Sequence, residues 1–360
     1  MCKILNKLFL WAVACSLFFS CQRRAGDATL AYFGADCTVL APYDSVKLDD
    51  AGILFPTKIF VSEEKAFVVK QDGKDLLFVL NLQDGSGFSA FRKGRGPGEF
   101  IEPTQIDMRG DSLYVYDINQ GVWSRVLAGS LRSEGPQVFD TLRSFRTAEM
   151  KGDDFLYVPT DAKSAGRGYV ALAVSPYWYC MVDWAGDKVG GGIAYLDLEE
   201  LSGFYARELV AFYRNSATVV SPDNTKVACA VYSGSAISFA SVEGTDLVEK
   251  KRLVFEAPRV LPVRREGYPL IQIDQECIRG FVKLFADDRY VYGLYSGKLR
   301  SDKSGPAFEC QHVLVFDWEG RPVRRYLLEN TVCGICVEKG ILYGVSMHPE
   351  SRLYKYRIDL

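Results

Sequence analysis

The stretch Asp111-Ser-Leu-Tyr-Val-Tyr-Asp117 decides the fold class of this chain of 360 residues. Its apolar and aromatic residues favour strands, and an aspartate bounds the run at each end, as in a short strand between two turns. Five similar runs share the pattern, and their starts lie roughly 40 to 70 residues apart, which brackets the period of a four-stranded propeller blade. These runs begin at Lys65, Phe155, Lys226, Arg289 and Gly340. The repeat predicts an all-β fold, a six-bladed β-propeller with four-stranded antiparallel blades.

A second repeated segment predicts the outer hairpin of the blades. Val182-Asp-Trp-Ala-Gly186 nearly repeats Phe316-Asp-Trp-Glu-Gly320, and Leu80–Gly85 and Val242–Gly244 hold comparable places. Glycine suits such tight turns because it adopts positive φ without a clash of a Cβ atom. We expect each segment to be a strand end, a turn and a return strand.

The two ends of the propeller domain are predicted to meet. An early strand within Thr38–Leu48 is expected to complete the blade that ends with Arg352–Ile358, because a closed ring leaves only short, protected strand edges. Two stretches interrupt the repeat. Leu196–Phe212 is predicted to contain a short helix as an insertion, and Glu256–Tyr268 to be a long exposed connection.

The first two dozen residues are typical of an export signal. Lys3 and Lys7 lead into the apolar run Leu8–Phe19, which is too short to span a membrane and ends in Ser20-Cys21. This ending resembles the bacterial lipobox, whose cysteine is acylated and becomes the mature N-terminus. We therefore predict lipid attachment at Cys21. The chain is expected to divide into a signal peptide (1–20), a lipid-anchored tether (21–37) and a single propeller domain (38–360).

Charge and the residues after the anchor predict location and partners. Gln22-Arg23-Arg24 lacks the acidic cluster typical of surface-exported lipoproteins, so we expect an outer-membrane protein that faces the periplasm, with surface exposure as the alternative. The net charge of −2 becomes −4 when Lys3 and Lys7 leave with the signal, and such a balance provides no basic field for nucleic acid. The expected partners are the membrane, through the lipid, and an unidentified envelope protein or small ligand. We expect a monomer.

The cysteines are predicted to be mainly buried strand residues. Of ten, seven remain once Cys2, Cys15 and Cys21 are set aside, and an odd number leaves at least one thiol unpaired. Cys333-Gly-Ile-Cys336 has the spacing of a redox or metal motif. In an extended strand, however, residues three apart point to opposite faces, and no second pair of ligands lies nearby. A structural role is therefore favoured.

The glycine-rich segment Phe91-Arg-Lys-Gly-Arg-Gly-Pro-Gly-Glu-Phe100 is the most distinctive in the chain. Together with Pro103 and the strand Asp111–Asp117, it resembles the six-bladed, TolB-like propeller lipoproteins of Bacteroidetes-type bacteria. The resemblance extends over about residues 38 to 360. It implies a propeller that is periplasmic or attached to the cell surface, and it supplies no catalytic residues.

Three interpretations of the glycine-rich segment can be weighed from its residues. A dinucleotide fingerprint would place a third glycine where Glu99 stands and would open a helix, which Phe100-Ile-Glu-Pro103 does not. A tight loop between blades accounts for the glycines. A ligand contact is the remaining interpretation, since arginine pairs well with carboxylates. The predicted ligand-binding residues are Arg92, Lys93, Arg95 and Glu99.

Catalytic chemistry has little support in the sequence. The chain contains two histidines, His312 and His348, and no nucleophile-elbow or zinc-helix motif accompanies them. Propeller metal sites gather side chains from several blades, so Asp111, Asp117, Asn119, Asp161 and Asp287 are either turn residues or metal ligands. Trp123, Tyr177 and Trp178 either stack on a ligand at the channel mouth or belong to the core.

The sequence therefore predicts a cell-envelope lipoprotein whose propeller is a non-enzymatic binding or scaffold module for a protein or small ligand. No cofactor is expected. The alternative is a metal-assisted hydrolase, lyase or lactonase with a divalent cation at the mouth of the central channel. Polar groups gathered at one end of the channel would indicate a site, whereas aliphatic side chains would plug it.

Overall fold

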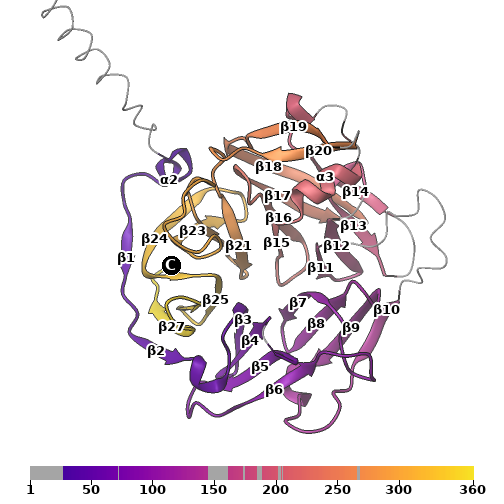
Figure 1. The fold of residues 1–360 in the computed structure, drawn as a ribbon, viewed down its shortest axis with the longest axis vertical. Coiled ribbons are helices and arrows are strands. Elements are labelled where there is room, and N and C mark those ends of the chain that lie inside the picture. The colour runs from indigo at the N-terminus through magenta and orange to yellow at the C-terminus, as the bar shows by residue number, and fades with distance from the viewer. Residues whose placement is uncertain are drawn as a thin grey trace, which may run out of the picture.

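Six sheets surround a central channel in the ring that Figure 1 shows. The structure is a computed structural model, and it describes residues 27–71, 73–144, 161–172, 175–184, 189–201, 204, 206–265 and 268–360. The predicted signal peptide and Cys21 lie outside the described residues. Among the residues that are described, no helix has the length and apolar character needed to cross a membrane.

Each blade is a four-stranded antiparallel sheet, and the first strand of each blade borders the channel. Blade 1 contains β3 (Pro56–Ser62), β4 (Lys65–Lys70), β5 (Asp75–Asn81) and β6 (Gly87–Arg92). Blade 2 contains β7 (Pro103–Arg109), β8 (Ser112–Asp117), β9 (Val122–Leu127) and β10 (Asp140–Ser144). Blade 3 contains β11 (Asp161–Ala165), β12 (Gly168–Leu172), β13 (Tyr177–Asp183) and β14 (Val189–Ala194).

The second half of the ring follows the same plan. Blade 4 contains β15 (Ala217–Val220), β16 (Lys226–Ala230), β17 (Ser235–Glu243) and β18 (Asp246–Glu256). Blade 5 contains β21 (Phe281–Ala286), β22 (Tyr290–Tyr295), β23 (Cys310–Asp317) and β24 (Pro322–Val332). Blade 6 contains β25 (Gly334–Glu338), β26 (Ile341–Ser346), β27 (Arg352–Arg357) and, from the N-terminal part of the chain, β2 (Asp44–Lys47).

Strand β2 closes the ring, which confirms the predicted architecture. It pairs antiparallel with β27, with Asp44 opposite Lys355 and Lys47 opposite Arg352. The preceding strand β1 (Thr38–Leu40) instead runs parallel to β24 and adds a fifth strand to blade 5. Pro42 separates the two short strands, because a proline has no N–H to donate to a ladder. The predicted single strand is therefore two strands in two neighbouring blades.

The repeated sequence runs occupy equivalent places in the blades. Five of the six predicted runs form the second strands β4, β8, β16, β22 and β26. The sixth, at Phe155, lies outside the described residues, and the second strand of blade 3 is β12. The four glycine-containing segments join the third and fourth strands of their blades, as expected of outer hairpins.

The two interruptions have regular structure. Within Leu196–Phe212, the 3-10 turn η5 (Glu199–Leu201) precedes the helix α3 (Ala206–Tyr213), as predicted. The expected connection Glu256–Tyr268 instead contains β19 (Val260–Arg265), which forms a hairpin with β20 (Tyr268–Ile273). Pro262 lies within this hairpin, opposite Ile271. A two-stranded sheet tolerates this proline, since both of its strands are edges.

The segment before the ring is docked onto it. Asp27 caps the short helix α2 (Ala28–Tyr32) by accepting hydrogen bonds from the N–H groups of Thr29 and Leu30. The Tyr295 hydroxyl in blade 5 donates to Asp27 Oδ2 at 2.8 Å, and Thr29 Oγ1 lies 2.7 Å from Ser235 Oγ in blade 4. This clasp, residues 27–33, therefore joins blades 4 and 5.

Large aromatic side chains fill the spaces between blades. Between blades 2 and 3, the rings of Tyr116, Trp123, Tyr169 and Trp184 contact one another, with centroids 5.2 to 5.7 Å apart. Trp123 and Trp178 are fully buried, so they belong to the core. Offset and edge-to-face ring pairs stabilise such interfaces beyond the burial of their apolar area.

The described cysteines are all free thiols. Cys333 Sγ donates to the Pro56 carbonyl, and burial raises the pKa of Cys333 and that of Cys336 to about 12. Both thiols therefore remain protonated and unreactive at neutral pH, in agreement with a structural role.

Cys37 is the exception among the described thiols, because it is partly exposed whereas the other six are buried. We expect a maleimide at pH 7 to label Cys37 first, with the other six labelled only on unfolding. Mass spectrometry of the labelled peptides checks this order. Early labelling of Cys333 or Cys336 in the folded protein would contradict the burial described above.

Candidate binding site in the central channel

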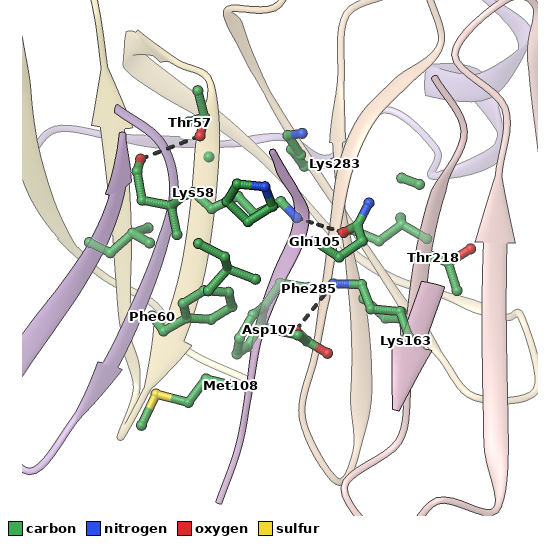
Figure 2. Close-up of a pocket in the computed structure, with 18 of the residues that line it drawn as sticks. Thr57, Lys58, Phe60, Gln105, Asp107, Met108, Lys163, Thr218, Lys283 and Phe285 are labelled. Carbon is green, nitrogen blue, oxygen red and sulfur yellow. Dashed lines mark hydrogen bonds and ion pairs between the residues drawn. The ribbon is translucent and has the colours of Figure 1, made fainter. Parts of the chain in front are cut away.

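A cavity of about 530 Å³ occupies the central channel (Figure 2). It is lined by the first strands of all six blades, namely β3, β7, β11, β15, β21 and β25. Its volume falls in the range of small-molecule sites, which is about 300 to 1,000 Å³. The channel is therefore large enough for a ligand.

The two ends of the channel are formed by different loops. The chain arrives from the preceding blade on one face of the ring, and each first strand begins there. The second strand of the blade runs back and ends on the same face. Lys70, at the end of β4, and the loop residues that line the cavity on this face define the mouth; the loop residues are Gln71, Lys93, Ile101, Glu102, Arg214, Asn215, Ser216 and Phe308. Met108 and Arg109 end β7 and define the opposite end of the channel, the floor.

The cavity lining is positively charged although the whole chain is slightly acidic. Seven basic side chains and two carboxylates line it, against a net charge of −2 for the chain. A recess with one sign of charge and low-dielectric walls concentrates oppositely charged ligands. The basic residues are Lys58, Lys70, Lys93, Arg109, Lys163, Arg214 and Lys283, and the carboxylates are Glu102 and Asp107.

Asp107 is the carboxylate at the centre of this lining. Lys163 Nζ lies 3.1 Å from Asp107 Oδ1, and Arg109 Nε lies 3.8 Å from Asp107 Oδ2. Burial acts to raise the pKa of Asp107, but the charges of Lys163, Arg109 and Lys58 outweigh it and hold the pKa below its usual value. Asp107 is therefore ionised, and a single negative charge faces several cations.

Hydrogen bonds across the channel connect neighbouring blades. Lys58 Nζ on β3 donates to Gln105 Oε1 on β7 at 2.8 Å, and Figure 2 shows this contact together with the pair of Lys163 and Asp107. Residues two apart in a strand share a face, which places Gln105 and Asp107 on the same side of β7. The first strands of blades 1, 2 and 3 are thus linked by polar side chains within the channel.

Arg109 stabilises the floor of the channel through hydrogen bonds to two neighbouring blades. Its guanidinium donates to the carbonyls of Val220 at 2.5 Å and Ser221 at 3.3 Å in blade 4, and to that of Ser164 at 3.0 Å in blade 3. Burial lowers the pKa of Arg109, against the opposing charge of Asp107. Its two terminal nitrogens are committed to these carbonyls, so Arg109 has a structural role that joins three blades.

Replacement of Arg109 by alanine should destabilise the propeller. Hydrogen bonds from a charged donor contribute about 1.5 to 3 kcal/mol, and their loss also leaves buried carbonyls unsatisfied, so we expect R109A to lower the free energy of unfolding by about 3 kcal/mol. Urea denaturation measures this change. R321A removes an exposed ion pair with Asp317 and should change the free energy of unfolding far less than R109A does. Equal losses in the two variants would exclude the bracing role.

The sequence-predicted ligand residues are distributed over the loop between β6 and β7. Lys93 lies at the mouth and lines the cavity, whereas Arg92, Arg95 and Glu99 are not part of the lining. The Glu99 carboxylate accepts a hydrogen bond from the Gly96 N–H at 2.8 Å. The structure thus brings one of the four residues to the channel, and a ligand contact by any of the four remains a prediction.

The glycine-rich loop is held in place by contacts with Glu99, Gln137 and Asp117. A Cβ atom at Gly94 would lie 1.9 Å from Glu99 Oε2, so a larger residue there would displace the Glu99 side chain. Gly98 adopts a φ of +75° and packs against the Gln137 carbonyl. The Asp117 carboxylate accepts hydrogen bonds from four backbone N–H groups, those of residues 101, 102, 119 and 120, and so fixes the end of the loop. The glycines therefore serve a tight loop beside the mouth.

The other candidate residues lie away from the channel. His312 is half-buried in β23, where burial and the charge of Arg325 lower its pKa, and exposed His348 lies 3.7 Å from Glu309. Asp287, like Asp117, accepts hydrogen bonds from backbone N–H groups in a turn. Within the described part of the chain, no three or more His, Cys, Asp or Glu side chains are grouped to hold a metal ion.

The main channel residues were missed by the sequence analysis. Lys58, Gln105, Asp107, Lys163 and Lys283 are spread over four blades, and no local motif connects them. The available signal was a charged or polar residue in the middle of an otherwise apolar first strand. Such a residue must face water or a polar cavity, and in a propeller that cavity is the axis.

Comparison with known proteins agrees with this architecture. A family model described as TolB-like 6-blade propeller-like matches residues 40–340. The chain belongs to this TolB-like family. The match includes the four antiparallel strands of each of blades 1 to 5 together with β2 and β25 of blade 6, and it leaves out β26 and β27. No curated protein sequence matches the chain.

Solved structures similar to this TolB-like propeller are remote in sequence. A member of the DUF4221 family from Bacteroides vulgatus is 10% identical, with a TM-score of 0.49, and the alignment covers 88% of this chain and 97% of the other. The Cps50 (Swd1) propeller domain of Myceliophteria thermophila is 7% identical, with a TM-score of 0.45 and coverages of 89% and 100%. BamB from Moraxella catarrhalis is 10% identical, with a TM-score of 0.35 and coverages of 84% and 69%.

Proposed function

We propose that this protein is a cell-envelope lipoprotein whose propeller is a non-enzymatic binding module. Its recognition site is the mouth of the central channel, and its ligand is a small anion or an anionic group on an envelope partner. The observation that carries the proposal is the excess of basic side chains in the cavity lining. The N-terminal export signal, which ends at Cys21, supports the envelope location.

The physical argument is one of charge compensation. Cations in a recess lose hydration, and an anion that enters the recess recovers part of that loss through charge-assisted hydrogen bonds. Asp107 and Glu102 are the two carboxylates of the lining, against seven basic side chains, so the lining carries a net positive charge. An anionic ligand would complete the electrostatics of the channel.

A titration of small anions tests the binding role. Acetate, citrate, inorganic phosphate and 3-phenylpropionate are each added to the purified protein in a calorimeter. We expect saturable binding of at least one of them, weakened about tenfold or more in the double variant K58Q/K283Q, since loss of a charged hydrogen bond costs about 1.5 to 3 kcal/mol.

The matched control is K250Q/K339Q, which removes the same charge from exposed lysines on β18 and on the β25–β26 turn, away from the cavity lining. This control should bind like the wild type. If no anion binds, or if the two double variants weaken binding equally, the proposed recognition site is wrong.

Lipid attachment is tested separately. We expect cells that express the protein to incorporate labelled palmitate into it, and the C21S variant to lose the label and leave the membrane fraction, because acyl chains provide the anchor. Fractionation with a soluble periplasmic marker provides the reference. Membrane retention of unlabelled C21S would overturn the anchor at Cys21.

A further inference from the structure

Two first strands carry the same short sequence at the channel. Lys58-Ile59-Phe60 lies in β3 of blade 1, and Lys283-Leu284-Phe285 lies in β21 of blade 5. All six residues line the cavity. Neither triplet belongs to the repeated second-strand runs that define the blades, so the fold alone does not account for the coincidence.

Because of strand geometry, the lysine and the phenylalanine of each triplet lie at two different depths in the channel. Residues two apart point to the same side, so each lysine and its phenylalanine share a face, about 7 Å apart along the strand. The blades are related by rotation about the channel, and their first strands therefore run in the same direction, away from the mouth. Lys58 and Lys283 form an upper, cationic level, and Phe60 and Phe285 form a lower, aromatic level (Figure 2).

The remaining channel residues fit these two levels. Gln105 accepts the hydrogen bond from Lys58 at the upper level. Toward the floor, Met108 adds an apolar side chain, and Arg109 is held by backbone carbonyls. Phe60 and Phe285 are partly buried residues that line the cavity, and each also packs against a hydrophobic cluster of the blades.

We infer that the channel binds a small amphiphilic organic anion, with its anionic head at Lys58 and Lys283 and its apolar, preferably aromatic, body against Phe60 and Phe285. This inference rests on the proposed function and names the ligand class of that site. An inorganic anion would be attracted by the positive charge of the lining but would make no apolar contact with the two rings. A ligand with both parts buries the ring surface as well, at about 25 cal/mol per Å² of apolar area.

Three probes separate the contributions of head and body. 3-Phenylpropionate has both, acetate has the head alone, and 3-phenylpropanamide has the body with an uncharged head of similar shape. We expect calorimetry on the purified protein to give 3-phenylpropionate at least about tenfold tighter binding than either partial probe, because each part contributes more than about 1.4 kcal/mol.

The aromatic level is tested by F60L/F285L, which keeps apolar side chains in place and so limits the cost to folding. This variant should weaken 3-phenylpropionate severalfold and leave acetate or phosphate unchanged. K250Q/K339Q again serves as the control. The comparison of the three probes on the wild-type protein tests the preference for an amphiphilic anion even if F60L/F285L is unstable.

The outcomes distinguish the two proposals. Equal affinity for phosphate, acetate and 3-phenylpropionate would overturn the amphiphile and leave an anion-binding channel standing. Tighter binding of the uncharged amide than of the acid would overturn both the cationic level and the proposed function. Preference for 3-phenylpropionate, lost in K58Q/K283Q and reduced in F60L/F285L, would support both.

Discussion

Closure of the ring is the constraint on which the rest of this structure depends. Strands β2 and β27 pair antiparallel over four residues each, and this pairing joins the N-terminal part of the chain to its C-terminal strand. Without this pairing, β27 would be the open edge of blade 6, and blade 1 could separate from its neighbour. With it, every blade packs against two others, and the aromatic interfaces are held on both sides. The position of each first strand around the axis follows from this closure.

A closed ring of six blades leaves a space at its axis that side chains must fill or line. Here the sequence places lysines, a glutamine and an aspartate among the apolar residues of the first strands. Such residues weaken a core unless they are satisfied, and the cross-channel pairs of Lys58 with Gln105 and Lys163 with Asp107 satisfy some of them. These polar and charged side chains distinguish the axis from the apolar interfaces between the blades.

The blades could be predicted from sequence because their signals are local. Asp111–Asp117 and Arg289–Gly297 show strand and turn chemistry within a few residues, and the glycine turns at Gly186 and Gly320 mark the hairpins. The channel could not be predicted in this way, since Lys58 and Lys283 are far apart in sequence and become neighbours of one cavity only after the ring closes. The hairpin of β19 and β20 was missed because Pro258 and Pro262 suggest a connection, while Val260, Leu261 and Val263 favour a strand.

The clasp that joins α2 to blades 4 and 5 has a mechanical consequence for a protein anchored at Cys21. Asp27, held by Tyr295, lies six residues beyond the proposed anchor, and six residues reach at most about 21 Å even when fully extended. The connection between the proposed anchor and the propeller is therefore residues 21–27, which is shorter than the whole predicted tether of residues 21–37. If Cys21 carries a lipid, the propeller would be held close to the bilayer next to blades 4 and 5, and this short connection would restrict the directions in which its channel can open.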